Sequence, residues 1–121
     1  MPKFMTLVKG SENHAPPPPG LFAAIDRLMK EAGPKLAGVG GLLGSNKGAT
    51  VRQSKGKVTV KDGPFTEVKE VIGGFAIYEV ASLDEAKEWT RKFVDAHIEH
   101  FPDWDFEVEI RQMIDGPPPQ L

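Results

Sequence analysis

The sequence predicts an α+β fold in which two helices cover one face of an antiparallel β-sheet. Two segments have apolar residues at helical spacing, and short segments of apolar or alternating character lie around them. Along the 121 residues, the expected order is strand, helix, strand, hairpin, strand, helix, strand. Two βαβ-like halves in this order are typical of a ferredoxin-like plait, here with an inserted β-hairpin.

The first half of the predicted fold contains a strand, a helix and a glycine-rich strand. Residues 3–9 are apolar at nearly every position, as in a strand covered on both faces. Residues 21–32 have leucine, isoleucine and methionine at helical spacing, and Gly33-Pro34 ends this helix. Residues 35–45 form an apolar run with four glycines, which predicts a strand with a bulge or the close approach of a backbone or a ligand.

A hairpin and a further strand follow. Residues 50–54 and 57–61 are separated by Lys55-Gly56 and alternate between valine and polar residues, which predicts a hairpin with one face in water. Residues 74–80 read as the next strand. Alternation places Phe75 and Ile77 on one face of it and Ala76, Tyr78 and Val80 on the other.

The second helix and the last strand complete the pattern. Ser82 and Glu85 form a capping box at the start of the helix, and Pro102 forces an end before it. The expected buried stripe consists of Leu83, Ala86, Trp89 or Thr90, Phe93 and His97. Residues 105–113 alternate strictly, so the apolar Phe106, Val108 and Ile110 should face the helices and Glu109 and Arg111 the other side.

The expected arrangement leaves one face of the sheet without a cover. The predicted occupants of that face are Met5 and Leu7 of the first strand and the row of Ala76, Tyr78 and Val80. This surface is too apolar to meet water alone. Pairing two such sheets across a two-fold axis covers it, so we expect a homodimer.

Composition limits the classes of function. The chain has no cysteine, which excludes disulfides, thiolate chemistry and a cysteine-rich zinc site. The net charge of -2 does not favour nucleic acid or anionic lipid as a partner. The apolar stretch near the N-terminus is too short for a signal peptide, and no window approaches the roughly 18 apolar residues of a membrane helix. We therefore expect a cytoplasmic protein without a cofactor.

Two proline tracts interrupt an otherwise ordinary composition. Residues 1–115 are expected to form one domain that contains a proline-rich loop at 13–20, and residues 116–121 form a proline-rich tail. Such tracts favour extended polyproline II. They act either as spacers or as docking sites for a proline-reading domain.

Several blocks of the sequence resemble a known family. The segment 61–74, KDGPFTEVKEVIGG, together with the terminal EVEIRQ, resembles the YCII-related family in its DGPF branch. The opening KFMTLVK and the stretch SNKGATV also fit the family's pattern. The resemblance covers nearly the whole chain except the proline tracts.

This resemblance implies a ferredoxin-like fold in a dimeric α/β barrel. Some of the wider relatives are small-molecule enzymes that use a histidine–aspartate pair, and many DGPF members occur near, or fused to, alternative sigma factors. Two departures count against inherited catalysis. The first-helix segment FAAIDRLMKEA lacks the family's histidine, for which His14 in the proline loop is no match, and Gly40 stands where the branch often has an acidic residue.

The last strand and the DGPF turn supply the candidate site residues. Glu109 and Arg111 share a face, where they either pair with each other or leave Arg111 free to bind a carboxylate or phosphate of a ligand. Tyr78 should project to the same face if the strands are in register.

The DGPF turn has two possible roles. In a purely structural role, Asp62 caps the turn through an Asx bond, Gly63 permits a positive φ, and Phe65 anchors the turn in the core. Alternatively, Asp62 and Thr66 line a pocket. The nearby Glu67, Lys69 and Glu70 either form a solvated face or contribute a charge across the dimer axis.

Two hypotheses of function follow. The first is a dimer that binds a small molecule through the candidate residues Arg111, Glu109, Tyr78, Asp62, Thr66, Lys69 and Glu70. The second is a small-molecule enzyme whose acid–base groups come from Asp62, Glu109 or Tyr78. No metal site is expected, because His97, His100 and Asp103 make a poor ligand set.

Overall fold

The computed structural model describes residues 1–116 and contains a four-stranded sheet, two helices and a separate hairpin. The sheet consists of β1 (Lys3–Gly10), β2 (Leu36–Gly41), β5 (Val71–Glu79) and β6 (Phe106–Gln112). The helices are α1 (Pro19–Ala32) and α2 (Leu83–His100), and the hairpin consists of β3 (Ala49–Ser54) and β4 (Lys57–Asp62). Two short 3-10 turns, Gly33–Lys35 and Ser45–Lys47, precede β2 and β3. Most of the predicted proline tail, residues 117–121, lies outside the described residues.

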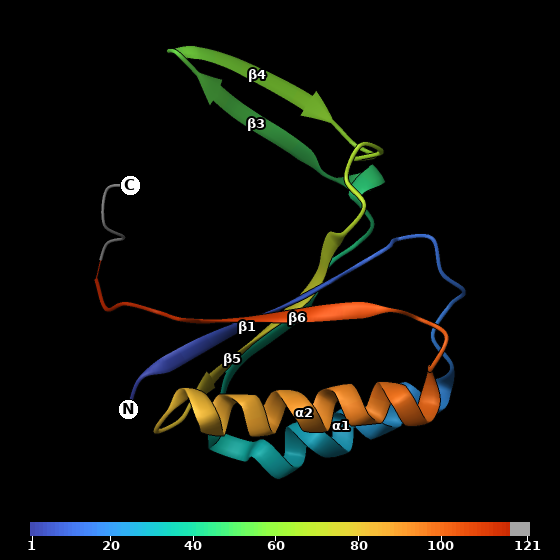
Figure 1. Ribbon diagram of the computed structural model, residues 1–121, viewed down its shortest axis with the longest axis vertical. Coiled ribbons are helices and arrows are strands. Elements are labelled where there is room, and N and C mark those ends of the chain that lie inside the picture. The colour runs from blue at the N-terminus through green and yellow to red at the C-terminus, as the bar shows by residue number, and fades with distance from the viewer. Residues whose placement is uncertain (117–121) are drawn as a thin grey trace.

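The observed topology confirms the α+β prediction. The strands lie in the order β2-β5-β1-β6, and every neighbouring pair is antiparallel. Without the hairpin, the elements run β-α-β-β-α-β, which is the connectivity of the predicted plait. Both helices cover the same face of the sheet, and the other face has no layer over it (Figure 1). We call this second surface the open face.

The core between the sheet and the helices reverses one part of the prediction. Tyr78 and Val80 are buried in it with Phe4, Trp89 and Leu28. Phe4 lies opposite Tyr78 and Thr6 opposite Ala76, so the row of Ala76, Tyr78 and Val80 faces the helices rather than a second subunit. Strand alternation identifies which residues share a face, but not which of the two faces is covered.

The open face carries the other row of β5. Met5 lies opposite Ile77 and Leu7 opposite Phe75, and all four side chains are only partly buried. The glycines of β2 make room for these side chains. A Cβ at Gly40 would lie 2.7 Å from the Phe75 ring, so Phe75 occupies the space that a side chain at position 40 would need.

Element boundaries differ from the prediction at α1, β2 and β5, and β5 begins at Val71 rather than residue 74. Helix α1 begins at Pro19 rather than residue 21, with Pro18 at the N-cap. A proline in the first helical turn costs no hydrogen bond, because the backbone N–H groups of that turn have no acceptor within the helix. Strand β2 ends at Gly41, and the chain then turns through Ser45–Lys47 before the hairpin.

The hairpin has the predicted register and turn. Lys55 and Gly56 both have positive φ, as a two-residue type I′ turn requires. Val51 pairs with Val60, and Val58 shares their face, while Arg52 and Thr59 form a pair on the other face. The hairpin projects away from the body on the side of the sheet opposite the helices (Figure 1). Every residue of β3 and β4 is exposed.

The start of α2 confirms the predicted capping box. The Ser82 hydroxyl accepts a hydrogen bond of 3.1 Å from the Glu85 N–H, and the Glu85 carboxylate accepts one of 3.3 Å from the Ala81 N–H. In contrast, Leu83 was expected in the buried stripe, and it is exposed.

Removing this N-cap should destabilise the protein measurably. We expect Ser82→Ala to lower the free energy of unfolding by about 1 kcal/mol, the usual loss for a serine cap. Urea denaturation followed by circular dichroism measures this change. The exposed strand residue Ser54 provides a control, since Ser54→Ala removes no cap. Equal stabilities of the two variants would show that the Glu85 carboxylate alone holds the helix start.

Candidate functional site

Glu109 and Arg111 lie on the open face, as predicted, and they pair with each other. The Arg111 guanidinium donates to a Glu109 oxygen at 3.0 Å, and the Lys9 ammonium donates to the other oxygen at 2.8 Å. The bonds from Lys9 and Arg111 lower the pKa of Glu109, and the bond to Glu109 raises the pKa of Lys9. The carboxylate therefore stays ionised and is shared by two cations.

Tyr78 lies on the other side of the sheet, so the expected grouping of Tyr78 with Glu109 and Arg111 is wrong. Its ring stacks on Trp89 of α2, with centroids 6.2 Å apart and an interplanar angle of 15°. Burial raises the pKa of the Tyr78 hydroxyl, which keeps it protonated. Tyr78 thus belongs to the core between the sheet and the helices.

The candidates around the DGPF turn are exposed. Asp62 ends β4 opposite Ala49, and within residues 1–116 its carboxylate makes no hydrogen bond, so the expected Asx bond does not form. Thr66, Lys69 and Glu70 are exposed beyond the turn. These residues do not meet Tyr78, and one chain does not assemble the predicted site.

Gly63 has a different role from the one that the sequence suggested. Its φ is not positive, and the Gly63-Pro64 peptide is cis. A Cβ at Gly63 would lie 1.7 Å from the Ser45 carbonyl oxygen, so glycine allows two backbone segments to touch. Phe65 is only partly buried and lies outside the core cluster, where its ring approaches Gly48.

A hydrogen-bonded clamp fixes this turn to the body. The Ser45 hydroxyl accepts a hydrogen bond of 2.9 Å from the Phe65 N–H and donates one of 2.6 Å to the Glu12 carboxylate. The Ser45 N–H also donates to Glu12, and these bonds lower the pKa of that carboxyl group. Glu12 therefore links the loop after β1 to the base of the hairpin.

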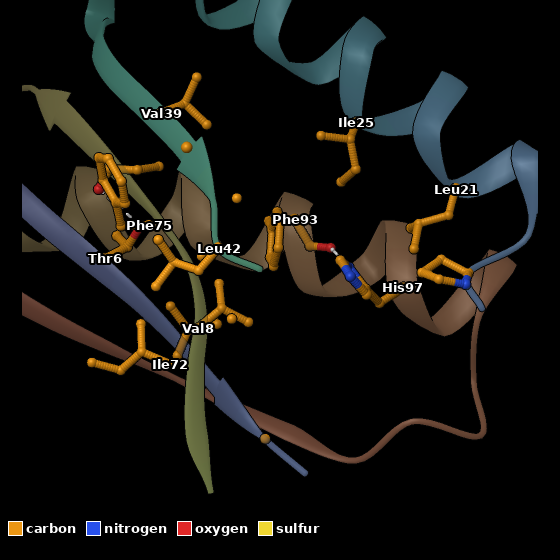
Figure 2. A pocket seen from close by; sticks show the side chains of 18 of the residues that line it. Thr6, Val8, Leu21, Ile25, Val39, Leu42, Ile72, Phe75, Phe93 and His97 are labelled. Carbon is orange, nitrogen blue, oxygen red and sulfur yellow. Dashed lines mark hydrogen bonds between the residues drawn. The ribbon is translucent and has the colours of Figure 1, made fainter. Parts of the chain in front are cut away.

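A cavity of about 910 Å³ lies between the helices and the sheet. Side chains of α1, α2 and the sheet are directed toward it (Figure 2). The labelled lining residues are Thr6, Val8, Leu21, Ile25, Val39, Leu42, Ile72, Phe75, Phe93 and His97. Phe75 shares the open-face row with Leu7, so the lining includes residues from both faces of the sheet. Phe22, Leu42 and Leu43 also border it and are largely exposed, so apolar side chains surround its entrance.

Few polar groups face this cavity. The Thr6 hydroxyl is buried and donates to the Ala76 carbonyl at 3.1 Å. His97 is buried on α2, and its Nδ1 lies 3.0 Å from the Phe93 carbonyl oxygen. Burial lowers the pKa of His97, and the bond to that carbonyl offsets part of the effect. The imidazole is therefore neutral at pH 7.

Sequence reasoning missed the two histidines that border the cavity. His14 lies in the loop before α1, and its ring centroid is 4.9 Å from that of Trp104. His97 was interpreted as a satisfied core residue. The signal that distinguishes it is a titratable side chain on the apolar stripe of an amphipathic helix, where a leucine would serve the core equally well. Among the described residues, no cluster of His, Asp and Glu is suited to a metal ion.

Comparisons with known proteins identify the family. A Rhizobium meliloti (strain 1021) protein that is described as uncharacterised is 43% identical over 76 residues. This stretch covers 63% of the chain and 60% of the length of that relative. Residues 3–102 match the model of the YCII-related domain, which includes the hairpin, the DGPF turn and almost all of the cavity lining. The chain therefore belongs to the YCII-related family.

Proposed function

We propose that this protein is a homodimer that binds a small, predominantly apolar molecule in the cavity between its helices and its sheet. The observation that carries the proposal is the cavity of about 910 Å³, which lies within the range of about 300–1,000 Å³ of ligand pockets. Its lining is mostly aliphatic and aromatic, with a small number of polar groups. This composition is typical of ligand sites in which a few hydrogen bonds fix the orientation.

The chemistry of the lining favours an uncharged ligand. Among the described residues, no lysine or arginine borders the cavity, and its charged members are the carboxylates Glu12 and Asp26. An anion placed there would lose its hydration without gaining a cation. The cavity thus differs from the expected Arg111 site, which required an acidic ligand.

The open face supports the dimer. Met5, Leu7, Phe75 and Ile77 form a half-buried apolar surface with no layer over it in one chain (Figure 1). Beside it lie Lys9, Glu109 and Arg111, which can pair again across a two-fold axis. Two open faces packed together complete a barrel with the helices outside, and the resemblance to the DGPF branch favours this assembly.

The hairpin is a second argument for a partner chain. Isolated two-stranded hairpins are marginally stable in water, and this one exposes Val51, Val58 and Val60 on one face. It rises on the same side of the sheet as the open face (Figure 1). A second subunit packed on the open face would therefore lie close enough to cover the valines of the hairpin.

The biological role that we propose is regulatory. The DGPF resemblance supports a role linked to alternative sigma factors, in the cytoplasm, with neither nucleic acid nor membrane as a direct partner. No helix within residues 1–116 is long and apolar enough to span a membrane. The alternative of an acid–base enzyme has less support, because Asp62, Glu109 and Tyr78 lie in three separate places in the subunit.

Blocking the cavity tests the binding proposal. We expect the neutral dye N-phenyl-1-naphthylamine to bind at one saturable site per chain, measured by its fluorescence. Ile25 borders the cavity, so Ile25→Trp should fill part of it and weaken dye binding at least about tenfold, or about 1.4 kcal/mol.

A matched control distinguishes binding in the cavity from nonspecific binding of the dye to the protein surface. Ile98 is 59% exposed on α2 and does not border the cavity, so Ile98→Trp should leave the dye affinity unchanged. If binding does not saturate, or if both tryptophan variants bind like the natural protein, the proposal is wrong.

A further inference from the structure

The orientation of His97 determines which ring nitrogen can meet a ligand. Its Nδ1 lies 3.0 Å from the Phe93 carbonyl oxygen, and a carbonyl oxygen only accepts hydrogen bonds. Nδ1 must therefore carry the hydrogen. In a neutral imidazole, the other nitrogen, Nε2, is then an acceptor with a free lone pair.

Within the described residues, the hydrogen bond of the His97 ring is the one between Nδ1 and Phe93. The ring packs against Phe93 and Phe106, with centroids 4.5 and 4.7 Å away, and lies 6.0 Å from the ring of Trp104. Within residues 1–116, no protein group hydrogen-bonds to Nε2. An acceptor without a partner in an apolar setting is costly, so a donor from outside the protein is favoured at this atom.

His97 lies at the cavity wall. Of the described side chains, the fully enclosed polar atom without a partner is Nε2 of His100, not that of His97. His97 itself borders the cavity, beside Phe93 (Figure 2). Space, a free lone pair and an aromatic wall therefore coincide at one end of the cavity.

We propose that Nε2 of His97 accepts a hydrogen bond from the ligand, which selects uncharged aromatic molecules that carry a hydroxyl or N–H group, such as phenols. This inference rests on the proposed binding function and names its ligand class. A carboxylate ligand is disfavoured twice, since it has no hydrogen to donate and the described lining offers no lysine or arginine. A pure hydrocarbon fits the apolar walls but offers no hydrogen-bond donor to Nε2 of His97.

Two probes of nearly equal shape test the hydrogen bond. 1-Naphthol carries a hydroxyl group where 1-methylnaphthalene carries a methyl group. The dissociation constants of both compounds can be measured by displacement of the fluorescent dye at pH 7. We expect His97→Phe, which retains an aromatic ring, to weaken 1-naphthol binding about tenfold. The affinity for 1-methylnaphthalene should change less than about twofold, since it makes no such bond.

A second variant and a direct measurement cover the case in which His97→Phe does not fold. His97→Gln keeps an acceptor oxygen and should retain part of the affinity for 1-naphthol. In the unaltered protein, 15N NMR of the imidazole should show hydrogen on Nδ1, and 1-naphthol should shift the Nε2 resonance while 1-methylnaphthalene leaves it in place.

The outcomes distinguish this inference from the function on which it rests. Equal weakening of both probes in His97→Phe, or an unmoved Nε2 resonance on binding of 1-naphthol, overturns the role of His97 and leaves the binding proposal standing. Failure of both probes to displace the dye from the unaltered protein overturns the ligand class. Absence of dye binding itself overturns the proposed function.

Discussion

Replacing Gly63 by alanine is expected to lower the free energy of unfolding by about 3 kcal/mol or more, the upper end for an overpacked site. The added Cβ would lie 1.7 Å from the Ser45 carbonyl oxygen and 2.6 Å from its carbon. Both are backbone atoms, which cannot rotate away as a flexible side chain does. The Phe65–Ser45–Glu12 hydrogen bonds hold the two segments together at this point, so relief of the collision breaks them.

Thermal denaturation measures this effect, and a nearby glycine supplies the control. A loss of 3 kcal/mol corresponds to roughly 10 °C in Tm for a domain of this size. A Cβ at Gly73 meets no atom within 4 Å, so Gly73→Ala should leave Tm nearly unchanged. Similar melting temperatures for the two variants would show that the turn is not clamped to Ser45.

Hydrogen exchange shows where the Gly63→Ala variant fails. We expect the hairpin amides to lose protection first, because the turn at Gly63 joins the hairpin to the body through Ser45 and Glu12. Protection that falls equally in β1 and β5 would instead place the effect in the central sheet.

Local chemistry in the sequence was enough to identify every strand and both helices. The capping box at Ser82 and the Lys55-Gly56 turn are specified by residues that are adjacent in the chain, and the structure contains both. Strand alternation also placed Phe106, Val108 and Ile110 correctly, because β6 is polar on one face and apolar on the other. In such a strand, the pattern itself identifies the covered face.

The face of β5 was mistaken because both of its rows are apolar. Phe75 and Ile77 alternate with Ala76 and Tyr78, and hydrophobicity does not distinguish the two sets. The pairing partners decide: Tyr78 lies opposite Phe4, under the helices, whereas Phe75 packs over Gly40. A long-range register of this kind is not encoded in either strand alone.

The sequence did not point to the cavity for a related reason. Glu109, Arg111 and Asp62 were chosen for their charge, yet charged residues on exposed strands mostly face solvent or pair with each other, as Arg111 does with Glu109. The cavity is lined by residues of α1, α2 and the sheet, which only the packing of the whole domain brings together. His97 showed the one local signal, a polar ring at an apolar position of α2.

Leu7→Lys is expected to convert the proposed dimer into monomers. In light scattering at micromolar concentration, the unaltered chain should show twice the mass of one subunit, from an interface that buries well over about 1,000 Å². Leu7 lies on the open face between Phe75 on β5 and Glu109 on β6. In a symmetric dimer, the interface would remove from water the ammonium groups introduced at position 7 of both subunits. This loss of hydration should raise the dissociation constant of the dimer at least about 100-fold.

The single subunit should tolerate the same change. A lysine at position 7 is directly opposite Glu109, and an opposite-charge pair across two strands is favourable. The Leu7→Lys monomer should therefore keep the circular dichroism spectrum of the natural chain. The control is Ile98→Lys, which places the same charge on an exposed position of α2, on the helix layer, and should leave the dimer intact. A natural chain that scatters as a monomer, or a Leu7→Lys variant that remains dimeric, would count against the open face as the subunit interface, because Leu7 lies on β1, one of the two inner strands of the sheet.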